Sequence, residues 1–184
     1  SELTAVPAWS WGYAVDVLNL IALLKGQAGK PGPLELADAS HLGLWGHSMG
    51  GGVAIRVMVV SPDVDAVVLY GSMSADDLLN YERLNTFFSN GEWGAEELQA
   101  SPQDLLRISP VNFLPDVGAA VSIHHGSADQ AVPPEWSDNL CAWLQDLGKD
   151  VECFSYPGQP HTFINRSDEL FRQRVQDFFD RTLK

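Results

Sequence analysis

Apolar residues in the first half of the chain follow two different spacings. Between residues 13 and 25 they recur at helical intervals, and Gly26 follows as a typical helix cap. Continuous apolar runs at residues 41–46 and 66–70 predict short buried strands. The long apolar stretch 50–60 between them ends at a Ser-Pro-Asp turn and predicts a helix that packs on two sides.

The second half repeats this alternation after a stretch of mixed helical pattern over residues 74–118. Residues 119–124 and 151–156 predict two further strands, and residues 134–147 between them predict a helix. Ser167 has the character of an N-cap, and the apolar face that follows predicts a final helix. Strands that are apolar throughout and alternate with helices imply a parallel sheet covered on both faces. We therefore expect a single α/β domain with about four strands.

The segment Gly46–Gly50, GHSMG, carries the clearest chemical signal. It fits the pattern G-x-S-x-G, in which a strained turn lifts a serine from the end of a strand to the start of a helix. Here the pattern follows a predicted strand and opens a predicted helix, which is the context that the chemistry requires. The alternative is a glycine-rich turn whose serine only caps the helix. A phosphate-binding loop is disfavoured because no lysine follows the glycines.

A serine nucleophile needs a base, and the chain offers five histidines. His47 adjoins the serine on a sharp turn, where neighbouring side chains diverge, and His41 lies at the opposite edge of the sheet. His124 and His125 end the third strand, where a structural role is favoured. His161 follows the fourth strand, at the carboxyl edge where parallel sheets place their sites. We assign His161 as the base, with an exposed loop histidine as the alternative.

The residue that orients the base is expected to be an acid at the same edge. Asp129 follows the third strand and precedes a proline-stiffened loop. Asp116 and Asp150 lie before strands, at the opposite edge, and Asp138 lies inside a helix. The sequence therefore favours Asp129, against the alternative of an ordinary turn or cap residue.

Three segments together resemble a known family. GLWGHSMGGG at 43–52, HHGSADQAVP at 124–133 and SYPGQPHTF at 155–163 are similar to the C-terminal catalytic part of α/β-hydrolases related to the prolyl oligopeptidase and dienelactone hydrolase groups. They occur in the family order of Ser, Asp and His. The dienelactone hydrolase group generally carries Cys where this chain has Ser48, so that part of the resemblance is the weaker one.

The resemblance implies a triad of Ser48, Asp129 and His161, with the backbone N–H of Met49 as one oxyanion donor. In the family, several strands come before the helix that resembles residues 13–25, and a loop among them supplies the second donor. This sequence starts after that point, so we expect a site with reduced strength.

The resemblance also implies that residues 71–118 form a helical cap-like insertion over the site. In the alternative interpretation its aromatic residues form the core of the insertion itself. The residues that we consider as substrate-binding candidates are His47, Tyr81, Phe87, Phe88 and Trp93.

Composition limits the partners. The chain has 24 acidic and 11 basic residues, a formal net charge of -13, which disfavours nucleic acid and anionic membrane surfaces. No apolar run approaches the ~20 residues that cross a bilayer, so we expect a cytoplasmic protein, with secretion left open. The two cysteines, Cys141 and Cys153, are expected to be free core thiols, and their spacing does not suggest a metal site.

These observations predict a serine hydrolase that cleaves small to medium carboxylic esters without a cofactor. The alternatives are a serine peptidase of the prolyl oligopeptidase type, and a catalytically weak fragment that acts as part of an assembly. Because the strand at 42–45 would lie at an unpaired sheet edge, we also expect a homodimer, or pairing with a separate N-terminal segment.

Overall fold

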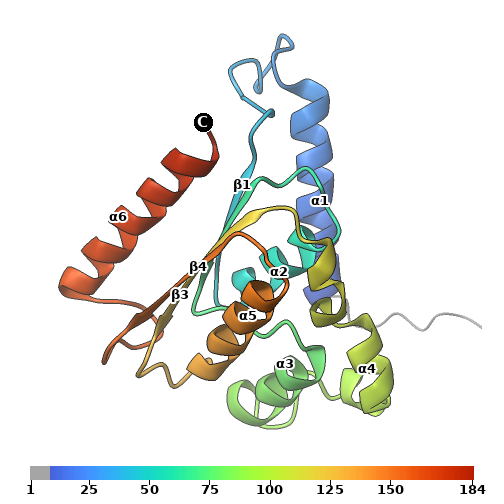
Figure 1. The fold of residues 1–184 in the computed structure, drawn as a ribbon. Helices are drawn as coiled ribbons and strands as arrows, with labels where there is room; N and C mark the ends of the chain where they lie inside the picture. Colours follow the sequence, from blue (N-terminus) through green and yellow to red (C-terminus); the bar gives the residue numbers. More distant parts are fainter. Residues whose placement is uncertain (1–8) are drawn as a thin grey trace, which may run out of the picture.

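Four strands form one sheet in the computed structural model, which describes residues 9–184 (Figure 1). The strands lie side by side in chain order, as β1 (Gly43–His47), β2 (Ala66–Tyr70), β3 (Ala120–Gly126) and β4 (Val151–Tyr156). Every neighbouring pair is parallel. All four carboxyl ends therefore meet at one edge of the sheet, and the expected α/β class is confirmed.

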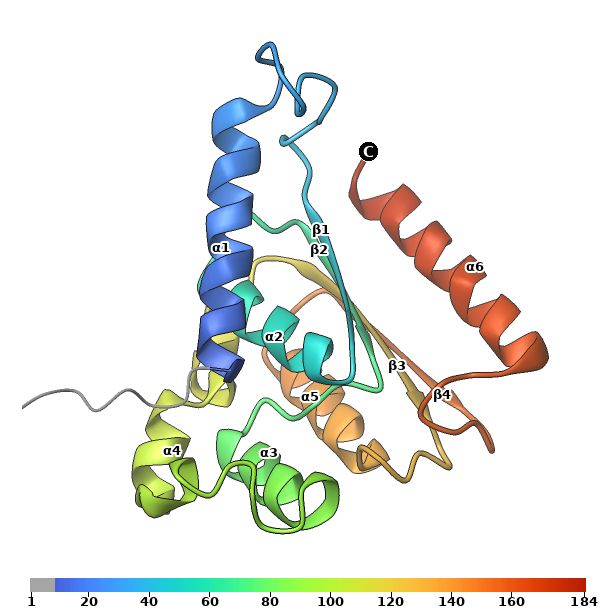
Figure 2. The same cartoon turned by 180° about the vertical axis from the view of Figure 1, so that it is seen from behind.

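Helices cover both faces of the sheet (Figure 2). On one face lie α1 (Trp9–Gln27), α2 (Met49–Met58) and α5 (Pro134–Asp146), and on the other lies α6 (Asn165–Thr182). The chain between β2 and β3 folds into short helical segments near the carboxyl ends of the strands. These segments are α3 (Asp77–Arg83), η1 (Leu84–Phe88), η2 (Glu97–Gln99), α4 (Pro102–Ile108) and η3 (Pro110–Asp116).

The alternation of side chains along β2 explains why its sequence is apolar without interruption. Val67 and Leu69 are fully buried in the core shared with α1, α2 and α5. Ala66, Val68 and Tyr70 point to the other face and join the core beneath α6. Because both faces of the sheet are covered, apolar side chains are favoured at both sets of positions.

The two cysteines form a disulfide bond, so the expectation of free thiols is wrong. Cys141 on α5 and Cys153 on β4 are bonded, with their Cα atoms 6.3 Å apart. The helix that connects β3 to β4 packs back onto both strands, and this brings the two side chains together. The bond joins the helix after the Asp129 loop to the strand before the His161 loop.

The last helix starts earlier than the sequence predicts. Ser167 was the expected N-cap, but α6 begins at Asn165, and the preceding residue, Ile164, makes no side-chain cap hydrogen bond. Asn165 has φ 56°, a left-handed conformation that asparagine adopts more readily than most residues. The chain can therefore turn into the helix before it reaches the serine.

Strand β1 forms an edge of the sheet, where Trp45 is 52% exposed. On the neighbouring α1, Leu20 and Leu23 are also half exposed. The open edge of β1 thus presents an exposed apolar side chain. Within residues 9–184, no helix is long and apolar enough to cross a membrane.

Candidate active site

Ser48 lies on the sharp turn between β1 and α2. Its backbone has φ 56° and ψ -119°, a conformation that is uncommon for a residue with a side chain. The turn is so tight that a Cβ atom on Gly46 would lie 2.3 Å from the backbone oxygen of Gly50. Glycine is therefore required at position 46, and the serine is held in a strained conformation of the kind found at nucleophiles of this fold.

Backbone hydrogen bonds fix this turn against the neighbouring strand. The N–H of Ser48 donates to the carbonyl of Tyr70 at 2.9 Å, and the N–H of Met73 donates to the carbonyl of Ser48 at 3.1 Å. Met49 is the first residue of α2, where amide groups have no partner within the helix. The backbone of Ser48 is thus hydrogen-bonded to residues at and after the end of β2. The adjacent N–H of Met49 has no acceptor within the helix and can donate to another group.

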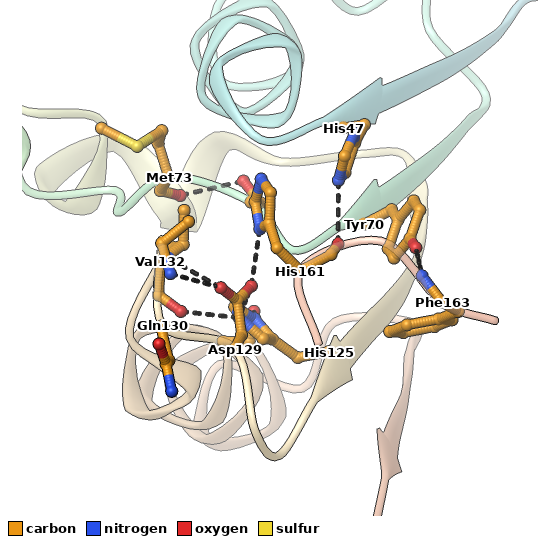
Figure 3. A network of polar contacts seen from close by, with 12 residues as sticks. His47, Tyr70, Met73, His125, Asp129, Gln130, Val132, His161 and Phe163 are labelled. Atoms are coloured by element: carbon orange, nitrogen blue, oxygen red, sulfur yellow. Dashed lines mark hydrogen bonds and ion pairs between the residues drawn. The ribbon is translucent and has the colours of Figure 1, made fainter. Parts of the chain in front are cut away.

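Asp129 and His161 are brought together from two loops at the same sheet edge (Figure 3). The Nδ1 atom of His161 lies 2.6 Å from Oδ2 of Asp129. A carboxylate can only accept, so Nδ1 carries the proton and the opposite ring nitrogen, Nε2, keeps its lone pair. The Asp129 side chain is fully buried and that of His161 is 24% exposed. This is the pair that the sequence predicts.

Further bonds hold the carboxylate of Asp129 in place. Its Oδ1 atom accepts from the backbone N–H groups of Ala131 and Val132, at 2.8 and 2.9 Å. Its Oδ2 atom also accepts a hydrogen bond from a second histidine, His125, whose Nε2 atom lies 3.1 Å away. The Nδ1 atom of His125 is 2.6 Å from Oγ of Ser137, so the imidazole bridges the carboxylate to α5.

His125 is a residue of the site that the sequence did not reveal. It was expected to be structural, whereas it contacts the acid directly. Its side chain is buried, and burial lowers its pKa, so the ring is neutral and donates through a single N–H. His125 lies four residues before Asp129, but only the folded loop shows that both side chains turn to the same point (Figure 3).

His47 supports the segment that carries His161. Its ring stacks on Tyr70, with centroids 4.3 Å apart, and lies 4.6 Å from the ring of His161. Its Nε2 atom is 3.1 Å from the backbone carbonyl oxygen of His161, so Nε2–H donates to that oxygen. Burial lowers the pKa of His47, which keeps the ring neutral. The sequence suggested a substrate contact for His47, and the structure shows a bond within the protein.

The remaining histidine of interest, His124, lies away from the serine turn. It is fully buried, with hydrogen bonds to Ser122 and to the hydroxyl of Tyr156, and it packs against Phe171 of α6. Burial lowers its pKa to about 3, so the ring is neutral. These contacts account for His124 as a structural residue.

The aromatic candidates of residues 71–118 occupy different surroundings. Tyr81 is buried in a cluster with Met73 and Leu105 of the insertion and Val132 of the loop after β3. Phe87 and Phe88 are partly exposed and pack edge to face on each other. Trp93 lines a cavity of about 530 Å³ that also reaches Met49, the residue after the serine. Among residues 9–184, no group of three or more His, Cys, Asp or Glu side chains is placed to hold a metal ion.

The sheet and the groups at its carboxyl edge define an α/β-hydrolase. A serine stands on a strained strand-to-helix turn, and a hydrogen-bonded His–Asp pair follows the next strands in the expected order. The sequence profile of the prolyl oligopeptidase family matches residues 33–184, so the chain belongs to that family. The family resemblance seen in the sequence is confirmed, and the chain is placed among serine hydrolases that include esterases and peptidases.

The proteins similar to this chain include both esterases and peptidases. A protein of Oryza sativa subsp. japonica, described as a probable carboxylesterase, is 38% identical over 53 residues, which are 29% of this chain and 23% of that protein. The acylaminoacyl peptidase of Pyrococcus horikoshii superposes with a TM-score of 0.75 at 22% identity, over 93% of this chain and 28% of the peptidase. The Pyrococcus furiosus esterase Pf2001 gives 0.64 at 18% identity, over 93% and 62%. The chain thus spans about a quarter of the carboxylesterase and of the peptidase.

Proposed function

We propose that the chain cleaves small to medium carboxylic esters through an acyl-enzyme on Ser48, with His161 as base and Asp129 as the residue that orients it. The hydrogen bond between His161 and Asp129 is the observation that carries this proposal. It leaves the Nε2 atom of His161 as the acceptor, and it does so at the sheet edge where Ser48 is held by the end of β2. No cofactor is required for this chemistry.

The proton movements follow from this arrangement. Nε2 of His161 takes the proton of Ser48 as Oγ attacks the ester carbonyl, and the buried Asp129 carboxylate stabilises the imidazolium that forms. The N–H of Met49 donates to the developing oxyanion. When the intermediate collapses, the C–O bond to the leaving alkoxide breaks and His161 returns the proton to it. Water then repeats these steps on the acyl-enzyme and releases the acid.

A peptidase of the prolyl oligopeptidase type is the second candidate, and the match to that family favours it. The same acyl-enzyme chemistry serves both substrates, but an amide needs a protonated amine as its leaving group. Turnover of p-nitrophenyl butyrate and of aminoacyl p-nitroanilides should be compared on one preparation. Faster hydrolysis of the anilides would replace the esterase assignment by the peptidase.

Labelling with a fluorophosphonate tests the activation of Ser48 itself. The wild type should be labelled at Ser48, and Ser48→Ala should lose both labelling and ester hydrolysis. Ser40→Ala, which changes an exposed serine before β1, is the matched control and should keep both. A Ser48→Ala variant with more than about a tenth of the wild-type kcat would exclude Ser48 as nucleophile.

The pH dependence tests the base. Only a neutral imidazole accepts the serine proton, so kcat/KM should be lost in acid, where the base is protonated. The His161→Ala variant should lose nearly as much activity as Ser48→Ala, because members of a triad act as a unit. If the wild-type serine resists labelling, the remaining reading is a catalytically weak fragment that works within an assembly.

A further inference from the structure

The loop after β3 accepts hydrogen bonds from an arginine of the insertion. Arg83 is the last residue of α3. Its Nε atom donates to the carbonyl oxygen of Ala131 at 2.9 Å, and its Nη2 atom donates to the carbonyl oxygen of Gln130. Both acceptors directly follow Asp129 in the chain. One guanidinium group therefore binds two successive carbonyl groups beside the acid.

These two carbonyl groups belong to the same peptide units as the amides that bind Asp129. The carbonyl of Gln130 shares a peptide unit with the N–H of Ala131, and the carbonyl of Ala131 shares one with the N–H of Val132. Both N–H groups donate to Oδ1 of Asp129, at 2.8 and 2.9 Å (Figure 3). A peptide unit is planar and rigid, so a bond that holds its oxygen also fixes the direction of its N–H. The guanidinium and the carboxylate thus bind opposite sides of the same two peptide units.

The side chain of Arg83 is itself held in place. Its Cζ atom lies over the ring of Phe87, 3.8 Å from the ring centroid. Such a contact attracts the charge and leaves the N–H groups at the edge of the guanidinium free to donate. At the other end of α3, the buried Asp77 forms an ion pair with Arg56 of α2. α3 is thus anchored both to the helix after the serine turn and to the loop after β3.

We propose that Arg83 is a positioning residue of the active site, which fixes the Asp129 carboxylate by holding the two peptide units that bind it. Its positive charge also polarises both units and strengthens their hydrogen bonds to the carboxylate. A carboxylate held in this way keeps the ring of His161 in one orientation. This role rests on the proposed function, in which an oriented base is needed both to form and to hydrolyse the acyl-enzyme.

The kinetics of Arg83→Met with p-nitrophenyl butyrate test this role. Methionine has a similar length but no hydrogen-bond donor. Because the base acts in both steps, kcat and kcat/KM should fall together by about tenfold, and KM should change less than about twofold. Arg107→Met is the matched control, because Arg107 lies on α4 of the same insertion, is exposed, and pairs with Asp104 at 3.8 Å. This control should leave both constants unchanged.

Hydrogen exchange measured by NMR tests the mechanism without any turnover. In Arg83→Met, the N–H groups of Ala131 and Val132 should exchange about tenfold or more faster, because the loop can then open locally. The amides of β3 should exchange as in the wild type, since the bonds of Arg83 go to the loop. A merely structural role would instead accelerate exchange in the loop and in β3 alike.

Three results would overturn the proposal. These are an unchanged kcat in a folded Arg83→Met variant, a rise in KM alone, and exchange that is either unchanged or accelerated throughout the sheet. If Arg83→Met fails to fold, Arg83→Lys decides, because lysine keeps the charge but lacks the planar fork that holds both carbonyl groups. Its kcat should fall at least about threefold with KM unchanged, and full activity would overturn the proposal as well.

Failure of the proposed function gives a different result. A wild type that neither hydrolyses esters nor reacts with a fluorophosphonate would refute the hydrolase. The exchange of the Ala131 and Val132 amides would still show whether Arg83 holds the loop that carries Asp129.

Discussion

Gly71 offers a test of how closely the proposed catalytic pair, Asp129 and His161, is packed. It directly follows β2, has φ +48°, and its N–H donates to the carbonyl of His124 at 2.8 Å. A Cβ atom at this position would lie 3.2 Å from Nδ1 and 3.3 Å from Cε1 of His161, and 3.4 Å from Oδ2 of Asp129. Gly71→Ala therefore adds one methyl group at the hydrogen bond between base and acid.

The substitution should have two separable effects. Placing alanine in a left-handed conformation costs roughly 1–2 kcal/mol of folding free energy, or about 2–4 °C in Tm for each kcal/mol. Ordinary carbon contacts lie at ~3.5–4.0 Å, so the His161 ring must move by a few tenths of an ångström. Since a misplacement of about 1 Å can cost 10²-fold in rate, kcat/KM should fall roughly four- to tenfold.

Gly148→Ala is the matched control for the first effect. Gly148 has φ +66°, but no atom of the described chain lies within 4 Å of its added Cβ. Tm and kcat/KM for p-nitrophenyl butyrate should be measured on both variants, with the rate of fluorophosphonate labelling as a second readout. Both variants should lose stability, and only Gly71→Ala should lose activity. Equal activity of the two variants would refute the argument that Gly71 makes room for the base.

Three further predictions concern stability and association. Burial lowers the pKa of His124 from 6.5 to about 3, so its unfolded form takes up a proton as pH falls below 6.5 and the native form does not. As the pH is lowered between these values, the free energy of unfolding should thus fall by up to ~1.4 kcal/mol per pH unit. Urea titrations at several pH values should show that the unfolding free energy of His124→Phe depends less on pH than that of the wild type, and an identical pH dependence would contradict this. The disulfide closes a loop with a sequence separation of 12 and should contribute about 3 kcal/mol to the free energy of unfolding. A reductant should therefore lower the Tm of the wild type but not that of the Cys141→Ala/Cys153→Ala double variant. An unchanged wild-type Tm would contradict this prediction. We also propose a homodimer through the open edge of Gly43–His47; sedimentation equilibrium at micromolar concentration and hydrogen exchange on this strand should give a dimer with protected amides, and a monomer with fast exchange would exclude it.

The strands were the part of the fold that the sequence predicted best. β2 and β4 occupy the predicted residues. β2 is an uninterrupted apolar run, which leaves few alternatives in a sheet covered on both sides, whereas β4 includes the polar residues Glu152 and Ser155. The start of α6 was missed because Asn165 reaches a left-handed conformation without a side-chain cap at Ile164. The pairing of Cys141 with Cys153 was missed because it depends on how α5 packs on β4.

The proximity of Asp129 and His161, the proposed catalytic pair, could be predicted because the topology of the sheet constrains it. Parallel strands end at one edge, so residues that follow β3 and β4 must lie near each other, and Asp129 and His161 do so. The partners of this pair could not be predicted in the same way. The contacts of His125 with Asp129, and of His47 with the His161 backbone, depend on side-chain directions in a packed loop.

The segment around His161 is hydrogen-bonded to residues at or just after the ends of three other strands. Asp129, after β3, accepts from its ring, and His47, at the end of β1, donates to its backbone oxygen. The hydroxyl of Tyr70, at the end of β2, accepts the N–H of Phe163 two residues later. A catalytic base must be held within a few tenths of an ångström, which a loop rarely achieves by itself. Because all strands of this sheet end at one edge, β1, β2 and β3 each place one hydrogen-bonding residue beside the segment that follows β4. These hydrogen bonds fix the position of His161 relative to the sheet.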